Sequence, residues 1–257
     1  MSTEPQTDPP QTDQRATISA LRGGLIVSCQ AYPGEPLRVA KVMSLMAQAA
    51  VLGGAVGIRA QGIDDVRMVH TAVSVPQIGL WKVGDDGVFI TPTLEHALAV
   101  AQAGAEIVAI DGTRRDRPDG RSLRQTVEEL HERTNCLVMA DVGDLEDGLA
   151  SADAGADLVG STLSGYTGSR PRTEGPDLEL LAELSAQLPI PVLAEGRVHT
   201  PDQARACIRA GAYAVVVGTA ITHPTTITRW FVDALGPDES RSTPAALDRS
   251  PGVDRLE

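Results

Sequence analysis

The sequence predicts a single α/β domain folded as an eight-stranded parallel barrel, the (β/α)8 or TIM barrel. Three observations support this fold class: short apolar runs alternate with longer amphipathic segments, eight such pairs occur, and a glycine motif recurs along the chain. The runs are almost wholly apolar, as expected for parallel strands buried on both faces of a sheet. A doubly wound open sheet is the competing architecture, but no GxGxxG motif follows the first strand.

Each predicted element has a sequence signal. The strands are short β-branched runs at Gly24–Cys29, Ala55–Ile58, Gln77–Trp81, Ile107–Ile110, Leu137–Ala140, Leu158–Gly160, Pro191–Ala194 and Tyr213–Val217. Helical spacing of apolar residues occurs at Leu37–Val51, Ser122–Arg133, Leu178–Gln187, Pro201–Ala210 and Thr225–Leu235. Pro201 and Pro224 stand where proline suits the first turn of a helix.

An internal repeat supports the count of eight. Ala-Gly-Ala occurs at 103–105, 154–156 and 210–212, with Gly-Gly-Ala at 53–55. Taking glycines 53, 104, 155 and 211 as equivalent gives intervals of 51, 51 and 56 residues, each spanning two strand–helix units. The chain therefore resembles four quarters of one barrel, although glycine is also what a helix-to-strand turn requires.

Composition sets the domain limits and excludes several partners. Residues 1–16 and 236–257 are rich in Pro, Ser, Thr and Asp and are expected to be disordered tails around a barrel at 17–235. The net charge of −12 argues against nucleic acid and membrane as partners, but leaves a small anion open. The absence of an apolar run of membrane length, of a signal peptide and of a cysteine framework predicts a reduced, cytoplasmic protein.

Polar residues follow nearly every predicted strand. In a barrel of this type the active site lies at the carboxyl ends of the strands, so these residues should share one rim. They are Gln30, Arg59, Lys82, Asp111, Asp141, Ser161 with Thr162, Glu195, and Gly218 with Thr219. Any one of them could be a capping or loop residue, but together they predict a site.

Lys82 is the most informative of these residues. The chain has 22 basic residues and only two, Lys41 and Lys82, are lysine. Burial can lower the pKa of a lysine amine so that it acts as a base or nucleophile, which arginine cannot do. Glu195 and Asp141 offer carboxylates from the seventh and fifth strands, which could transfer protons or pair with an arginine.

Two glycine turns predict a phosphate site. Gly196-Arg197 and Gly218-Thr219 follow the last two strands, where barrels often bind phosphate through backbone N–H groups. The loop from Leu163 to Gly168, which includes Ser164, could be a lid or could contact a sugar. Cys29 has no histidine positioned to activate it. No ligand spacing for a metal is seen among His70, His96, His131, His199 and His223.

Several of these segments together resemble one known family. They are residues 23–31 (GGLIVSCQA), 57–60 (GIRA), 90–93 (ITPT), 139–141 (MAD), 162–167 (TLSGYT) and 193–201 (LAEGRVHTP). From about residue 20 to 235 the chain is similar to the N-acetylmannosamine-6-phosphate 2-epimerases. That family consists of phosphate-binding barrels which interconvert N-acetylmannosamine 6-phosphate and N-acetylglucosamine 6-phosphate in sialic acid catabolism.

The resemblance implies a role for each site residue. Lys82 and Glu195 would transfer the C2 proton, while Gln30, Arg59 and Asp141 would orient the sugar. Gly196, Arg197, Gly218 and Thr219 would bind the phosphate, with Thr162 and Ser164 as further substrate contacts. Epimerisation beside a carbonyl requires neither a redox cofactor nor a metal, so none is expected.

The chain also departs from the family, and two other functions stay open. Asp111-Gly112-Thr113 and the segment from Ala140 to Asp144 differ from the usual sequences, and the loop after Lys82 is shorter. The same lysine would suit a Schiff-base aldolase, and the altered loops would suit a non-catalytic sugar-phosphate sensor. The amphipathic last helix could pack on its own barrel or form a homodimer.

Overall fold

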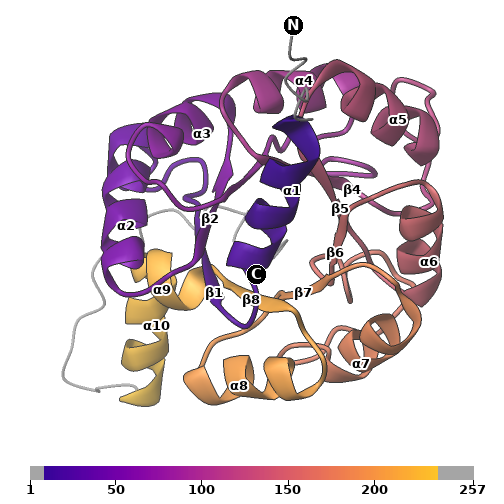
Figure 1. The fold of residues 1–257 in the computed structure, drawn as a ribbon. Helices are drawn as coiled ribbons and strands as arrows, with labels where there is room; N and C mark the ends of the chain where they lie inside the picture. Colours follow the sequence, from indigo (N-terminus) through magenta and orange to yellow (C-terminus); the bar gives the residue numbers. More distant parts are fainter. Residues whose placement is uncertain (1–8, 237–257) are drawn as a thin grey trace, which may run out of the picture.

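Eight parallel strands close into one barrel in the order β1 to β8, with helices around the outside (Figure 1). This computed structural model describes residues 9–236 of the chain. The strands are β1 Leu25–Cys29, β2 Gly57–Gln61, β3 Gln77–Leu80, β4 Ile107–Asp111, β5 Leu137–Asp141, β6 Leu158–Gly160, β7 Val192–Glu195 and β8 Ala214–Val217. The predicted (β/α)8 fold class and all eight predicted strands are confirmed, with ends that differ by at most three residues.

The helices follow the strands in alternation. They are α1 Pro9–Ala20, α2 Ala40–Leu52, α3 Ile63–His70, α4 Leu94–Gln102, α5 Leu123–Arg133, α6 Leu145–Asp153, α7 Leu178–Gln187, α8 Pro201–Arg209, α9 Thr219–Thr222 and α10 Pro224–Ala234. Side-chain caps fix several of their starts; Ser122 and Thr200, for example, each form a capping box. None of the helices within residues 9–236 is long and apolar enough to cross a membrane.

Strand alternation separates the inside of the barrel from the outside. Along β4, Ile107 and Ala109 belong to the cluster inside the barrel, whereas Val108 and Ile110 pack against the surrounding helices. The same alternation points Arg59 of β2 inward between the outward-facing Ile58 and Ala60. The inward positions nearest the carboxyl ends are therefore where polar side chains meet.

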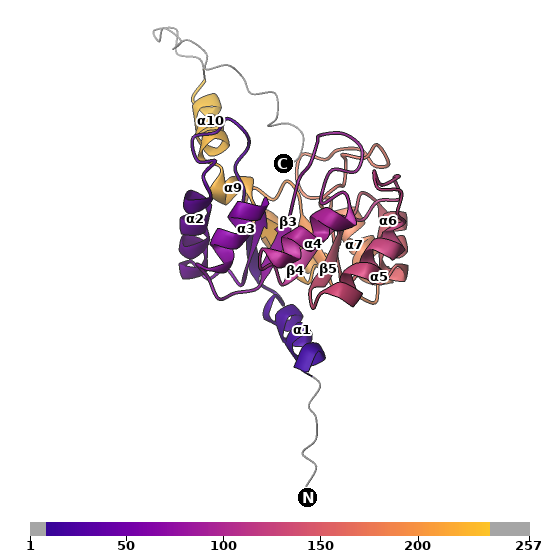
Figure 2. The same ribbon diagram turned by 90° about the horizontal axis from the view of Figure 1, so that it is seen from above.

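Helix α1 lies at the N-terminal mouth of the barrel and reaches the interior with its C-terminal end. Figure 1 shows this helix across the mouth, and Figure 2 shows it on the side opposite α10. Leu21, just after the helix, is fully buried in the interior cluster, and Ile18 packs on the same cluster. Residues 9–16, predicted to belong to a tail, are helical, and Gln14 donates from Nε2 to the Asn135 carbonyl at 3.1 Å. Residues 1–8 and 237–257 of the predicted tails lie outside the described part of the chain.

The repeated glycines precede every second strand. Gly104, Gly155 and Gly211 have φ angles of 109°, 95° and 108°, in the left-handed region that favours glycine. Their counterpart in the first quarter is Gly54, with φ 98°, and not Gly53, which ends α2 with φ −78°. The four-quarter repeat predicted from the sequence is present, but its first interval is one residue shorter than we assigned.

Candidate functional site

One cavity lies at the carboxyl ends of the strands and collects most of the predicted site residues. It contains about 700 Å³ of empty space, counting the part open to solvent. Nine of the eleven residues predicted from the sequence line it: Gln30, Arg59, Lys82, Thr162, Glu195, Gly196, Arg197, Gly218 and Thr219. Asp141 and Ser164 do not line it.

A buried arginine forms the floor of this cavity. Arg59 is only 1% exposed and donates from Nη2 to Asp141 Oδ2 at 2.6 Å and from Nη1 to Asp141 Oδ1 at 3.2 Å. The same Nη1 lies 2.9 Å from Glu195 Oε2. One guanidinium thus joins carboxylates from β5 and β7, in the two-pronged geometry that makes arginine–carboxylate pairs strong.

Asp141 binds the Arg59 guanidinium and does not line the cavity. It is fully buried, and besides Arg59 it accepts a hydrogen bond from Thr162 Oγ1 at 2.6 Å. The sugar contact predicted for Asp141 stays a prediction: the side chain does not line the cavity, and each carboxylate oxygen accepts a hydrogen bond within the barrel. Its side chain holds the floor of the site in place.

Lys82 follows β3 and is held at the cavity wall. Its Nζ donates to Gln30 Oε1 at 3.0 Å, and the Gln30 amide in turn donates to Ser28 Oγ at 2.7 Å. The amine also lies 5.8 Å from the centre of the Tyr32 ring. Burial, reinforced by repulsion from Arg59, lowers the pKa of Lys82 to about 8. A substantial fraction of neutral amine is therefore present near neutral pH.

Glu195 ends β7 and shares the cavity with Lys82. Burial raises the pKa of its carboxyl to about 7, and repulsion from Asp141 adds to this, while Arg59 and Lys82 act in the opposite direction. The two groups therefore titrate close together, one acid and one base in the same enclosed space. Such paired shifts are typical of groups that exchange protons with a substrate.

The turns after β7 and β8 form the other side of the cavity. Gly196 has φ 107°, and a side chain there would approach the carbonyl oxygen of Thr162. Gly218 begins the short helix α9, which Thr222 fastens to β1 by donating from Oγ1 to the Ser28 carbonyl at 2.7 Å. Backbone N–H groups at such turns can bind a phosphate.

Arg197 contributes its backbone to the cavity, but its guanidinium is used elsewhere. The residue has φ 55°, a left-handed conformation that is uncommon outside glycine, and it is 4% exposed. Its Nε, Nη1 and Nη2 donate to Gly175 O, Ser164 O and Thr173 Oγ1 at 3.1, 2.8 and 3.0 Å. The sequence predicted that this turn binds phosphate through backbone N–H groups; a contact from the Arg197 side chain would break those three hydrogen bonds.

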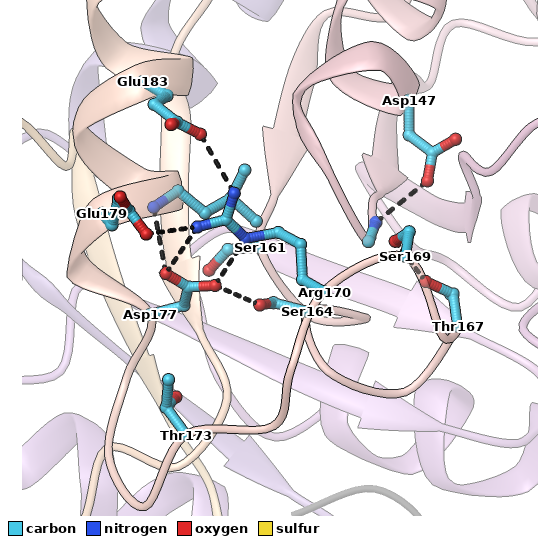
Figure 3. A network of polar contacts seen from close by, with 12 residues as sticks. Asp147, Ser161, Ser164, Thr167, Ser169, Arg170, Thr173, Asp177, Glu179 and Glu183 are labelled. Atoms are coloured by element: carbon cyan, nitrogen blue, oxygen red, sulfur yellow. Dashed lines mark hydrogen bonds and ion pairs between the residues drawn. The ribbon is translucent and has the colours of Figure 1, made fainter.

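Ser164 is similarly used inside the protein. Figure 3 shows its hydroxyl directed at Asp177, to which it donates at 2.6 Å. The side chain is 1% exposed and does not reach the cavity. The substrate contact predicted for Ser164 stays a prediction; in this structure the hydroxyl is directed toward the start of α7.

Some cavity residues were not selected from the sequence. Tyr32 and His223 line the cavity and pack edge to face, with ring centres 5.3 Å apart. His223 is buried and its ring nitrogens contact Thr226 and Glu35. Neither residue follows a strand directly, so the strand-end rule could not identify them; the proline after His223 was the only local signal. Cys29 is excluded from the chemistry, since burial raises its pKa to about 12.

No group of three or more His, Cys, Asp or Glu within residues 9–236 is arranged to hold a metal ion. The polar groups that line the cavity include an amine, a carboxyl, guanidinium, amide, hydroxyl and imidazole groups, and two glycine turns. This set suits proton transfer on an anionic substrate.

Comparisons with known proteins agree with this chemistry. A family model described as "Putative N-acetylmannosamine-6-phosphate epimerase" matches residues 43–237. A curated relative from Cutibacterium acnes, named as a putative N-acetylmannosamine-6-phosphate 2-epimerase, is 60% identical over 220 residues, which are 85% of this chain and 96% of the relative. A relative of the same name from Caldanaerobacter subterraneus is 47% identical over 222 residues, 85% of this chain and 94% of the relative.

A solved structure leads to the same family. The N-acetylmannosamine-6-phosphate 2-epimerase from Clostridium perfringens superposes with a TM-score of 0.82 at 38% sequence identity. The alignment covers 91% of this chain and 100% of that chain. The similarity therefore extends over the whole barrel.

The Arg59 floor gives a first prediction, for stability. Arg59→Met leaves two buried carboxylates without their cation and should lower the free energy of unfolding by about 3–5 kcal/mol, measured by urea titration. The matched control is Arg67→Ala, which breaks an ion pair with Asp64 in which the side chains are 60% and 85% exposed. The free energy of unfolding of that variant should fall by less than about 1 kcal/mol. Equal decreases in the free energy of unfolding of the two variants would contradict the role of Arg59.

Proposed function

Since the chain belongs to the N-acetylmannosamine-6-phosphate epimerase family, we propose that it interconverts N-acetylmannosamine 6-phosphate and N-acetylglucosamine 6-phosphate, with Lys82 and Glu195 as the proton-transfer pair. The observation that carries this assignment is the opposite pKa shift of the two groups in one cavity. The protein is thus an isomerase, and amino-sugar catabolism is the setting that we propose for it.

The reaction breaks and remakes one C–H bond. In the open-chain sugar, C2 lies beside the C1 carbonyl, so removal of its proton leaves the electron pair in an enolate. One member of the pair takes the proton from one face of C2 and the other returns a proton to the opposite face. Because C2 is neither oxidised nor reduced overall, the reaction requires no redox cofactor.

Arg59 and Gln30 support the pair. The guanidinium of Arg59 is a fixed positive charge at the cavity floor, which would stabilise the negative charge of the enolate. Gln30 accepts a hydrogen bond from the Lys82 amine and so fixes its direction. Thr162 lines the cavity next to Glu195, and we retain it as a substrate contact.

The phosphate of the sugar would lie against the two glycine turns. Gly196, Gly218 and Thr219 line the same cavity as Lys82, and backbone N–H groups at the start of α9 are suited to an anion. In this arrangement Arg197 binds through its backbone alone. The phosphate would then anchor the substrate so that C2 lies between the amine and the carboxyl.

The comparisons favour the epimerase over both alternatives. The relatives and the solved structure are named as epimerases. A Schiff-base aldolase would also use Lys82, but it would give no role to a protonated Glu195 on the opposite side of C2. A sensor without turnover would not need two groups with pKa values shifted toward each other.

We also propose that the protein is a cytoplasmic homodimer that associates through α10. This helix stands apart from the barrel in Figure 2 and exposes Phe231, Val232 and Leu235, at 70%, 55% and 82%. Such an apolar face at the end of an amphipathic helix favours contact with a second copy. The three cysteines are free thiols in the structure, consistent with a reducing compartment.

Hydrogen exchange tests the assignment of the pair. In D2O the wild-type protein should incorporate deuterium at C2 of both sugar phosphates, measured by proton NMR. Lys82→Met and Glu195→Gln should each slow this exchange by at least about 100-fold, since each removes one proton carrier. The control is Lys41→Met at the only other lysine, which is exposed on α2. Exchange that survives in Lys82→Met would reject the pair.

The pH dependence follows from the two pKa values. In the active form, Lys82 and Glu195 together hold one proton. This form appears as pH rises through the lower pKa, about 7, and is lost as pH rises through the higher pKa, about 8. A plot of kcat/KM should therefore be bell-shaped with its maximum between them. The substrate phosphate ionises near pH 6, to be followed separately by phosphorus NMR. A rate that keeps rising above about pH 9 would contradict this scheme.

The oligomer is tested by sedimentation. Wild-type protein should sediment at twice the mass of one chain, and Phe231→Asp should sediment as a monomer because the charge would be buried at the interface. Leu52→Asp, at a residue 90% exposed on α2, is the matched control and should stay dimeric. A monomeric wild-type protein would refute the homodimer.

A further inference from the structure

Two arginines form hydrogen bonds with the segment between β6 and α7. We call residues 161–177 the β6–α7 loop. Arg197, from the turn after β7, donates to three residues of the loop. Arg170 lies within the loop and contacts the start of α7 (Figure 3). Neither guanidinium has a part in the proton transfer described above.

The contacts from Arg197 bring together distant parts of the loop. Its three donors reach the carbonyl of Ser164, the hydroxyl of Thr173 and the carbonyl of Gly175. The backbone of Arg197 stays in a left-handed conformation, with φ 55°, that residues other than glycine rarely adopt. Such a conformation persists only where surrounding contacts enforce it, and here those contacts are the loop.

The contacts from Arg170 join the loop to the first two turns of α7. Its Nε donates to Asp177 Oδ2 at 3.0 Å, and Asp177 caps α7 by accepting from the backbone of Leu180. The Arg170 guanidinium is only 19% exposed as a side chain, and it also pairs with Glu179 and Glu183. This is a partly buried ion network, which is stronger than an isolated surface pair.

Ser164 connects the two arginines. Its hydroxyl donates to Asp177 at 2.6 Å, while its carbonyl accepts from Arg197 at 2.8 Å. A continuous chain of hydrogen bonds therefore runs from Arg170 through Asp177 and Ser164 to Arg197, and then through the backbone to Gly196 in the cavity wall.

We propose that Arg170 and Asp177 are positioning residues for the phosphate-binding turn at Gly196–Arg197, acting through Ser164 and the Arg197 guanidinium. The inference rests on the proposed function, because it assumes that this turn binds the substrate phosphate. When the ion pair is lost, Ser164 and the loop shift, Arg197 loses its fixed acceptors, and its strained backbone relaxes. The N–H groups then no longer converge on the phosphate.

Two variants and one control test this proposal. Arg170→Gln removes the cation. Asp177→Asn can keep Oδ1 as the cap of α7, but it replaces Oδ2, the oxygen that accepts from Ser164 and from Arg170 Nε, with an NH2 donor. Arg124→Gln is the control, because Arg124 pairs with Asp153 at the surface between α5 and α6. The measurements are the Kd for inorganic phosphate by calorimetry, KM and kcat for N-acetylmannosamine 6-phosphate, and Tm.

Both variants should weaken phosphate binding by about tenfold and raise KM in parallel, while kcat changes by less than about threefold and the control stays at wild-type values. A fall in Tm alone, with Kd and KM unchanged, would reduce the network to a structural role and overturn the proposal. An effect in Arg170→Gln that Asp177→Asn does not share would also overturn it. Wild-type protein that binds phosphate without turnover would refute the proposed function, but the phosphate titration would still decide this inference.

Discussion

The buried guanidinium of Arg59 is the interaction on which the site depends. It is taken out of water inside the barrel, and the carboxylates of Asp141 and Glu195 compensate for that loss. The guanidinium contacts the carboxyl of Glu195, supplies a positive charge at the cavity floor, and adds to the effect of burial in lowering the pKa of Lys82. One buried cation thus acts on both members of the pair that we propose for proton transfer.

Burial has opposite effects on the two members of the pair. Removing water disfavours the charged form of either group, so it lowers the pKa of an amine and raises that of a carboxyl. The barrel therefore brings Lys82 and Glu195 to about 8 and about 7 from values that are far apart in water. With matched proton affinities, neither group holds a proton so firmly that the reverse transfer becomes slow, as a reversible epimerisation requires.

The sequence predicts which residues reach the rim better than it predicts where their side chains point. The rule that rim residues stand at the ends of strands correctly placed four side chains in the cavity wall, those of Gln30, Arg59, Lys82 and Glu195. It works because side chains alternate regularly between the inside and the outside of the barrel up to the end of each strand. Beyond that end the backbone is irregular. The Arg197 side chain turns toward the β6–α7 loop and the Ser164 hydroxyl toward the start of α7, and no local pattern predicts either direction. His223 enters the cavity from the start of a helix. Helix α1 was missed because the sequence of residues 9–16 has the composition of a tail.

A crystal structure with an acyclic substrate analogue tests the account most directly. The alditol 6-phosphate of N-acetylmannosamine has no carbonyl and cannot react, but it keeps C2, the acetamido group and the phosphate. We expect its phosphate against the turns after β7 and β8, with the Lys82 amine and the Glu195 carboxyl on opposite faces of C2. A bound analogue with both groups on one face of C2, or with its phosphate at another rim, would contradict the central claim.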